Sequence, residues 1–320
     1  MPTLFDPVKI GALELPNRII MAPLTRMRAF EERAPGPLNL EHYVQRASAG
    51  LILTEATSVT AQGVGYPNTP GLWSELQVQR WTQIVSAVHN AGGRIVSQLW
   101  HVGRISDPVY LGGELPVAPS AIAAGGHVSV LRPQKSFEVP RALELHEIPG
   151  IVDDFRKAAR NAKRAGFDGV ELHAANGYLF DQFLHDGSNK RDDRYGGSIE
   201  NRARLLMEIT QAAIEVWGAD RVGIRLTPYG IANGSGEADP MPLYSYVVKA
   251  LDKLGLAYLH FIEPRSSGAG RAEVNHQNVP SAMVLFRPLW SGVLISAGGF
   301  TGEAAEAAIA QGHALSLIHI

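Results

Sequence analysis

The sequence predicts a single (β/α)₈ barrel, and two features of the chain carry that expectation. Seven apolar runs of strand length alternate with longer amphipathic segments, which is the pattern of βαβ units around a parallel sheet. No G-x-G-x-x-G sequence follows the first strand, so a doubly wound dinucleotide-binding sheet gains little support. Seven repeats favour a closed barrel, a fold that routinely takes roughly 250 residues or more as one domain.

The elements are expected in a regular order. The strands are the short apolar runs Arg18–Thr25, Leu51–Val59, Arg94–Trp100, Gly169–Ala174, Arg221–Thr227, Ala257–Ile262 and Gly292–Ser296. The helices are the segments of helical period Ser74–Ala91, Ile148–Ala165, Ser198–Trp217, Met241–Leu254 and Gly302–Gln311. Residues 107–140 are rich in proline and glycine and are expected to form a long excursion that covers the barrel mouth.

The eighth repeat is incomplete. After Gly302–Gln311, residues 313–320 can form one apolar strand, but no helix follows to cover it. We therefore expect a barrel domain over residues 1–313, with residues 314–320 as an anomalous tail in place of the final strand and helix. Such a truncation predicts an open edge and exposed apolar surface.

Composition excludes several classes of function. The net charge is −2 with both signs mixed along the chain, so no basic face is available for nucleic acid or anionic lipid. No run approaches the roughly 18 apolar residues that span a bilayer, and the N-terminus lacks the regions of a signal peptide. With zero cysteines, thiolate chemistry is excluded and redox work needs a borrowed cofactor. We expect a cytoplasmic protein with a small-molecule substrate, without nucleic-acid or membrane partners and without a bound metal.

The run from His173 to Tyr178 carries the chemistry. It follows an apolar strand, and barrels present catalytic groups at the carboxyl ends of their strands. The imidazole of His173 and the carboxamide of Asn176 can hold a carbonyl oxygen as it gains negative charge, and the phenol of Tyr178 can deliver a proton. These groups suit the reduction of an activated C=C bond. The alternative is that His173 is an ordinary buried core histidine.

Several motifs together resemble the old yellow enzymes, FMN-dependent ene-reductases on a (β/α)₈ barrel, over roughly residues 1–313. They are Met21–Arg26, Gln98–Arg104, His173–Tyr178, Ser188–Arg191 and Tyr195–Arg202. The residues of these motifs are most similar to those of the bacterial reductases of N-ethylmaleimide, xenobiotics and nitrate esters, with plant oxophytodienoate reductases as close neighbours.

The resemblance implies FMN as cofactor and assigns its contacts. Pro23, Thr25 and Ala56 would surround the isoalloxazine ring, and Gln98 would read its pyrimidine edge. Arg225 would stabilise the negative charge of the reduced flavin, while backbone groups of Gly298 and Gly299 would bind the phosphate. Read alone, Arg225 is also compatible with a salt bridge at the barrel mouth, and Gln98 and Thr25 with caps of strand ends.

On the substrate side the resemblance implies NADPH or NADH as reductant and an electron-poor alkene as substrate. His173 and Asn176 would grip its oxygen, hydride would arrive from flavin N5, and Tyr178 would protonate the α-carbon. Trp100 would shape the pocket and Tyr66 would close it from a loop.

Two alternatives stay open. One is an FMN-dependent dehydrogenase on the same barrel that oxidises an amine or a dihydro-ring. The other is a truncated, inactive flavin-binding remnant, because the family completes its phosphate site with a Gly-Arg pair that residues 315–320 lack. The sequence does not reveal the oligomeric state.

Overall fold

A closed parallel barrel forms the centre of the molecule. The structure is a computed structural model and describes residues 2–264, 279–312 and 315–318. Within these residues eight strands form the barrel wall and follow one another around it in chain order: β3 (Ile19–Met21), β4 (Leu51–Leu53), β6 (Ile95–Trp100), β9 (Gly169–Ala174), β10 (Val222–Leu226), β11 (Tyr258–Ile262), β12 (Val293–Ala297) and β13 (Leu315–Ile318). Pairing of β4 with β6 and of β13 with β3 closes the ring, so the expected (β/α)₈ barrel is confirmed.

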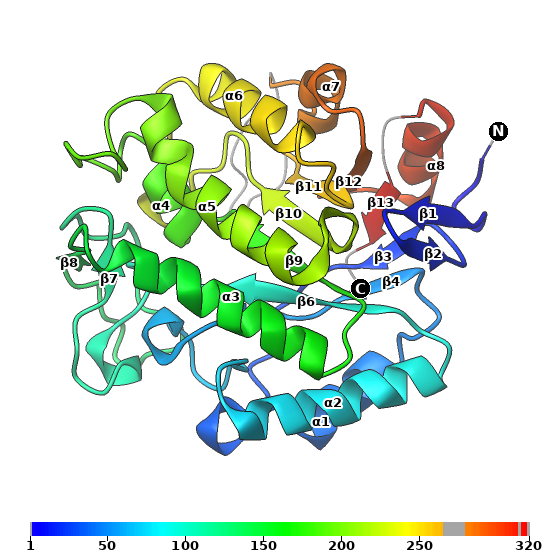
Figure 1. Cartoon of the computed structure of the whole chain (residues 1–320), viewed down its shortest axis with the longest axis horizontal. Coiled ribbons are helices and arrows are strands. Elements are labelled where there is room, and N and C mark those ends of the chain that lie inside the picture. Colours follow the sequence, from blue (N-terminus) through cyan, green and yellow to red (C-terminus); the bar gives the residue numbers. More distant parts are fainter. Residues whose placement is uncertain (1, 265–278, 313–314, 319–320) are drawn as a thin grey trace.

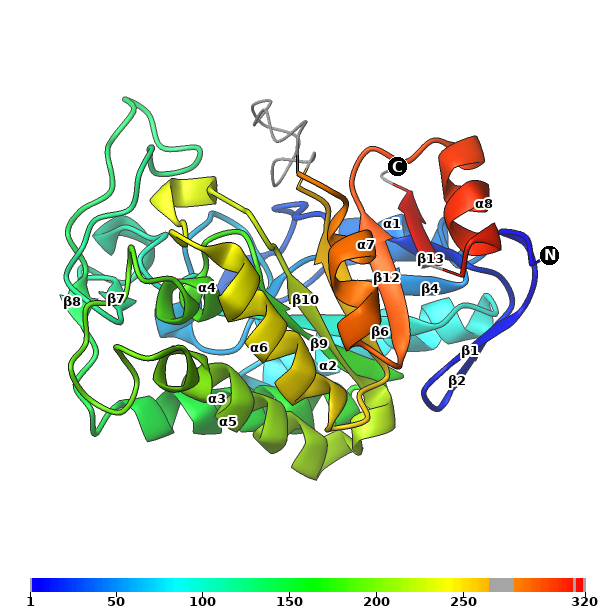
Figure 2. The ribbon, with the colours of Figure 1, turned by 90° about the horizontal axis from the view of Figure 1, so that it is seen from above.

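Helices cover the outside of the barrel, as Figures 1 and 2 show. They are α1 (Pro37–Val44), α2 (Glu75–Asn90), α3 (Ile148–Arg164), α4 (Leu179–Leu184), α5 (Ile199–Trp217), α6 (Pro240–Asp252), α7 (Ala282–Phe286) and α8 (Gly302–Ala310). Their inner faces bury a large apolar core against alternate strand residues, among them Leu99, Leu172 and Ile224. This burial of sheet against helix is the main source of the fold's stability.

Most predicted elements are present, with ends that differ by at most two residues, but the expected strand Arg18–Thr25 is only Ile19–Met21. Gly169–Ala174 is a strand over the expected residues. The expected strand Leu51–Val59 is instead two short strands, β4 and β5 (Thr57–Ser58), separated by residues 54–56. The short helices α1, α4 and α7 were not expected.

The last described strand, β13, lies between β12 and β3. Its residues Leu315, Ser316 and Leu317 pair with Ile295, Ser296 and Ala297 of β12 in parallel register. Because β13 pairs with β12 on one side and with β3 on the other, the open sheet edge expected from the incomplete eighth repeat is wrong. Residues 313, 314, 319 and 320 lie outside the described residues, so the domain boundary expected at residue 313 stays a prediction.

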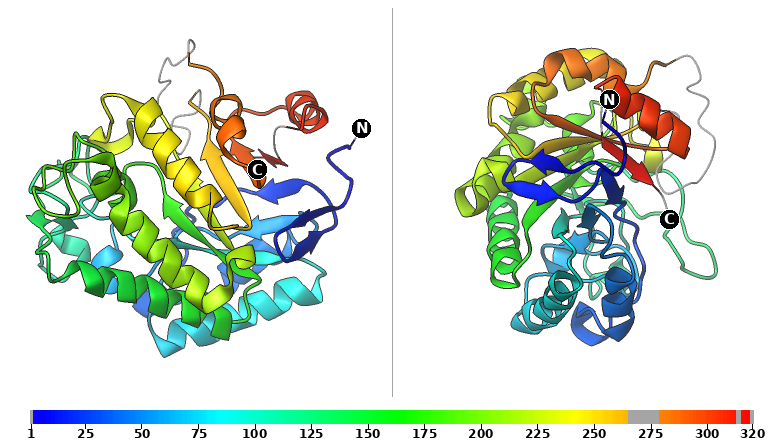
Figure 3. Two further views of the ribbon diagram at one scale, coloured as in Figure 1. Left: turned by 45° about the horizontal axis from the view of Figure 1, so that its top comes forward. Right: turned by 90° about the vertical axis from the view of Figure 1, so that its right-hand side faces the viewer.

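A hairpin that the sequence did not predict lies at the amino-terminal end of the barrel. Strands β1 (Val8–Ile10) and β2 (Leu13–Leu15) pair antiparallel, and the Ala12 N–H donates to the Asp220 carbonyl, 3.0 Å away, just before β10 begins. Ile10, Leu13 and Leu15 join the apolar cluster inside this end of the barrel. Figure 3 shows the hairpin against the end of the strands.

The excursion after β6 occupies the opposite end. It contains the short parallel strands β7 (Val117–Ala118) and β8 (Arg141–Ala142), which Figure 1 shows on the far side of the molecule from β1 and β2. The carboxyl ends of the barrel strands and this excursion therefore share one face, as expected.

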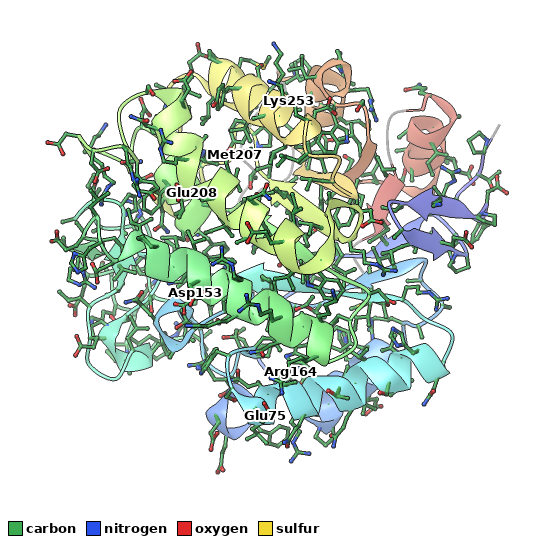
Figure 4. All side chains as sticks on the ribbon, viewed as in Figure 1. Glu75, Asp153, Arg164, Met207, Glu208 and Lys253 are labelled. Atoms are coloured by element: carbon green, nitrogen blue, oxygen red, sulfur yellow. The ribbon has the colours of Figure 1, made fainter. Side chains whose placement is uncertain are left out.

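The outer surface is polar and carries ion pairs between neighbouring helices. Arg164 of α3 donates to both carboxylate oxygens of Glu75 of α2, at 2.7 and 2.9 Å (Figure 4). No helix in the described ranges has the length and apolar character needed to cross a membrane.

Candidate active site

Polar side chains fill the barrel interior near the carboxyl ends of four neighbouring strands. In the sheet register Gln98 lies opposite Glu171, and Arg225 lies opposite both His173 and His260. Register partners in a parallel sheet point to the same side, and side chains alternate along each strand. Since the intervening leucines face the helices, these polar groups all face the interior. A polar, inward-facing layer at this end is where barrels hold their active sites.

Arg225 is a cation buried inside the barrel. Its side chain is only 7% exposed, and it forms no salt bridge within the part of the chain that the structure describes. Burial lowers the pKa of Arg225 to about 10, although Glu171 acts in the opposite direction. The guanidinium thus stays charged at neutral pH and offers its donors to the site interior. The alternative that Arg225 forms a salt bridge at the barrel mouth is therefore not supported within the described residues.

A hydrogen-bonded group lies beside Arg225. The Gln98 Nε2 donates to Glu171 Oε1 at 2.7 Å, and His260 Nδ1 lies 2.8 Å from Glu171 Oε2. All three side chains are fully buried. The sequence interpretation did not include Glu171, although its place two residues before His173 on one strand face signals a buried carboxylate in the site.

His173 is held as a neutral imidazole. Its pKa lies well below the ordinary value because the ring is buried and because Arg225 and His260 are near. Its Nδ1 is buried without a hydrogen-bond partner among the described residues. The ring lies 5.2 Å from that of Tyr178 and 6.3 Å from that of Trp100, between centroids. A neutral ring keeps one N–H donor for a ligand.

Asn176 occupies a strained turn that its neighbours hold in place. Its φ is +60°, a left-handed conformation that asparagine tolerates better than most residues. The backbone N–H of Asn176 donates to Thr227 Oγ1 at 2.7 Å, and Asn233 Nδ2 donates to its carbonyl at 3.0 Å. Its side-chain Oδ1 is buried and unpartnered among the described residues. These contacts fix the backbone and leave the carboxamide available.

Glycine is required at the next position of this turn. Gly177 has φ +76°, and a Cβ added there would lie 2.4 Å from the Ala232 carbonyl oxygen. Its N–H donates to Asp181 Oδ2 at 2.8 Å. The supporting residues Thr227, Asn233 and Asp181 lie outside the six-residue motif. The sequence interpretation therefore missed them.

Three aromatic side chains converge over this turn. The hydroxyls of Tyr66 and Tyr178 are 2.8 Å apart. The Trp100 ring lies 4.9 Å from the Tyr178 ring, nearly perpendicular to it, and 5.3 Å from the Tyr66 ring. The structure thus brings Tyr66, Trp100, His173 and Tyr178 together. Trp100 and His173 are almost fully buried, and the two tyrosines are half-buried.

The remaining predicted residues lie in loops at the same end of the barrel. Pro23 and Thr25 follow β3, and Ala56 follows β4; Pro23 and Ala56 are buried and Thr25 is half-buried. The Arg26 N–H donates to Glu55 Oε2 at 2.9 Å, which joins the two loops.

Gly298 and Gly299 follow β12, with φ +129° and +64°. They lead into α8, whose first turn is capped by the Thr301 hydroxyl. Backbone N–H groups in such a loop and at a helix N-terminus bind anions.

Comparison with protein families places the chain among flavoproteins. Residues 3–320 match the model of the NADH:flavin oxidoreductase / NADH oxidase family. A putative 12-oxophytodienoate reductase 4 of Oryza sativa subsp. japonica is 44% identical over 318 residues, which are 97% of this chain and 80% of the relative. The 12-oxophytodienoate reductase 2 of Arabidopsis thaliana is 43% identical over 320 residues, 97% of this chain and 82% of the relative.

Solved structures agree with this placement. Morphinone reductase in complex with tetrahydroNAD superposes with a TM-score of 0.91 at 46% identity, over 100% of this chain and 87% of that one. An old yellow enzyme homologue from Zymomonas mobilis superposes with a TM-score of 0.92 at 43% identity, over 99% of this chain and 88% of that one.

Proposed function

The chain belongs to the NADH:flavin oxidoreductase / NADH oxidase family, and is thus an FMN-dependent oxidoreductase with NADH or NADPH as reductant. Within this family, we propose that it reduces electron-poor alkenes. The C=C bond would be conjugated to the carbonyl of an enone or maleimide or to a nitro group, with nitrate esters as further candidates. The family confirms the resemblance to old yellow enzymes and the flavin cofactor. The observation that supports the finer proposal is that His173 and Tyr178 lie with their rings 5.2 Å apart at the end of β9, with Asn176 on the turn between them.

The residues present fit FMN. The Gln98 Oε1 and the Arg225 Nε are buried polar atoms without partners in the described residues, and a heteroaromatic ring with polar edges supplies such partners. We assign Pro23, Thr25 and Ala56 to the ring surface, and Gly298 and Gly299 to the phosphate. When bound, FMN supplies two-electron transfer from the nicotinamide to the alkene, which no side chain of this cysteine-free chain provides.

His173 and Asn176 would bind the substrate oxygen. The neutral imidazole donates one N–H and the Asn176 amide donates from Nδ2. Both donors act where solvent is largely excluded, so they stabilise negative charge as it develops on the oxygen. Losing one such donor typically costs about 2.7–4 kcal/mol of transition-state stabilisation.

Tyr178 would deliver the proton to the α-carbon. Its hydroxyl lies 2.8 Å from that of Tyr66, and its ring is held between Trp100 and His173. A positioned general acid contributes about 10²–10⁴-fold. We assign Trp100 and Tyr66 to the wall of the substrate pocket. The cytoplasm, which supplies NADH and NADPH, is the compartment that we propose for the reaction.

Absorbance spectroscopy tests the cofactor and the substrate class. The purified protein is expected to absorb near about 450 nm, as bound flavins do. Under anaerobic conditions NADPH or NADH should bleach this band, and cyclohexenone or N-ethylmaleimide should restore it. A colourless protein that cannot be loaded with FMN contradicts the proposal. Bleaching by an amine or a dihydro-ring, but not by reduced nicotinamide, would favour the dehydrogenase alternative.

Replacing Tyr178 with phenylalanine separates the two half-reactions. The variant should reoxidise with the alkene about 10²-fold or more slowly, because the proton donor is gone. Its reduction by NADPH should stay near the wild-type rate, since that step needs no proton from Tyr178. Stopped-flow absorbance measures both rates. Tyr246→Phe, on the outer helix α6, serves as the matched control, and equal loss in both half-reactions of Tyr178→Phe would exclude the proton-donor role.

A further inference from the structure

Glu171 is a buried carboxylate that lies next to the residues assigned to the flavin. It is fully buried on β9, two residues before His173 and on the same inward face. Its Oε1 accepts from Gln98 Nε2 at 2.7 Å and its Oε2 lies 2.8 Å from His260 Nδ1. Burial alone would raise the pKa of Glu171, but His260, Arg225 and Gln98 outweigh this effect and lower it, so the side chain is ionised.

An ionised carboxylate determines how the Gln98 amide is oriented. A carboxylate only accepts hydrogen bonds, so the amide must turn its NH₂ group toward Glu171. The opposite end of the amide, Oε1, is consequently directed away from Glu171. In the part of the chain that the structure describes, this oxygen is buried and has no hydrogen-bond partner. Buried acceptors of this kind are rare in native proteins and call for a partner.

We propose that Glu171 is a positioning residue for the flavin, which locks the Gln98 amide with its carbonyl oxygen presented to the imide N–H of the pyrimidine ring. This inference rests on the proposed FMN site. The imide N–H is the donor on an edge that otherwise carries two carbonyl acceptors. An amide in the reverse orientation would bring a second donor to it. His260 holds the second carboxylate oxygen and so keeps Glu171 aligned.

A double-mutant cycle tests whether Glu171 acts through Gln98. FMN dissociation constants are measured by flavin fluorescence for the wild type, Glu171→Gln, Gln98→Ala and the double variant. Each single change should weaken FMN binding about ten- to hundredfold, the value of one buried hydrogen bond. The double variant should bind no more weakly than Gln98→Ala, because Glu171 has nothing left to orient. Additive losses would mean that Glu171 supports the site without Gln98, and would overturn the proposal.

Exchanging the side chains of Gln98 and Glu171 should restore FMN binding. In Gln98→Glu combined with Glu171→Gln, one negative charge is kept and position 98 again presents an obligate acceptor, while the amide introduced at position 171 can donate to it. FMN affinity should return to within a few-fold of wild type. A swap variant that binds no better than Glu171→Gln alone contradicts the orientation mechanism. Circular dichroism of each apoprotein confirms folding, and the swap remains informative if Glu171→Gln does not fold.

The outcomes for this inference and for the proposed function are distinct. A wild-type protein that cannot bind FMN removes the flavin site itself. A wild-type protein that binds FMN while the cycle is additive, or while the swap fails, leaves the flavin site intact and removes only the role of Glu171. Riboflavin, which lacks the phosphate, should show the same ratios between variants, because the contact is to the ring.

Discussion

Asp181 connects the stability of the candidate active site to pH. Burial raises its pKa from 3.8 to about 7, although hydrogen bonds from the Gly177 N–H and the Tyr244 hydroxyl oppose the shift. The unfolded chain releases this proton near pH 4, whereas the folded chain holds it until about pH 7. The folded state therefore binds more protons in this window, and its stability falls as pH rises through it.

The Asp181→Asn variant should lose this pH dependence. Asparagine keeps an acceptor for the Gly177 N–H and cannot ionise. Between pH 5 and pH 8 the wild type should lose roughly 2–3 kcal/mol of unfolding free energy relative to the variant. Urea unfolding of both proteins at the two pH values measures the difference. Parallel pH profiles would show that Asp181 does not titrate in this range.

We expect Arg225 to lower the unfolding free energy of the apoprotein while it increases the affinity for FMN. It is buried without a salt bridge in the described residues, and burial lowers its pKa to about 10, so the folded apoprotein carries the cost of a desolvated cation. In Arg225→Met the apoprotein should gain about 1–3 kcal/mol of unfolding free energy. Glu171 keeps Gln98 and His260 as partners.

The same variant should bind FMN about 10²-fold more weakly, because the cation that we propose to lie beside the flavin is lost. Thermal unfolding of the apoprotein and fluorescence titration with FMN measure the two effects. Opposite signs are the expected result. A loss of stability together with unchanged FMN affinity would assign Arg225 a structural role only.

At the scale of elements, the barrel strands were predictable because each is a short run of mostly apolar residues between longer helical segments. Strand β9 matches the expected range completely. The helices α2, α3, α5, α6 and α8 have the length to show a helical period, and all were expected. Helices α4 and α7 hold six and five residues, too few for a period to be recognised.

Contacts between elements were less predictable than the elements. Glu171 and His260 are 89 residues apart in the chain and lie on strands separated by β10. At the Gly223 position of β10, an added Cβ would lie 2.2 Å from the Tyr258 ring, so the ring packs directly on that backbone. No local sequence pattern predicts these contacts between strands, because they depend on the sheet register. The six-residue run His173–Tyr178 was predictable because its groups are neighbours in sequence.

The start of α2 shows how a local signal stabilises one element. The Ser74 hydroxyl accepts from the Gln77 N–H at 3.3 Å, and the Gln77 side chain accepts from the Ser74 N–H at 3.1 Å, which forms a capping box. Ser74→Ala should lower the unfolding free energy by about 1 kcal/mol, whereas Ser74→Gly should lower it by only a few tenths. Urea unfolding of both variants measures the difference. A Ser74→Ala variant as stable as the wild type would indicate that the hydroxyl bond does not stabilise the start of α2.

At the scale of the whole molecule, the two ends of the barrel have different roles. The carboxyl ends carry polar, partly unpartnered side chains among the described residues, whereas the amino-terminal end is closed by the β1–β2 hairpin and an apolar cluster. Barrel enzymes commonly separate chemistry and stability in this way. The separation implies that changes at the closed end should affect folding but not the affinity for the cofactor.

Leu15→Ala tests this separation. Leu15 is 2% exposed and packs inside the closed end, so the substitution should remove about 2–5 kcal/mol of unfolding free energy. The FMN dissociation constant of the folded variant should stay within about twofold of wild type, because distant sites without shared contacts behave independently. Val284→Ala, at a half-exposed position of α7, should change stability by less than about 0.5 kcal/mol. A large loss of FMN affinity in Leu15→Ala would mean that the hairpin end and the proposed flavin site are coupled through the barrel.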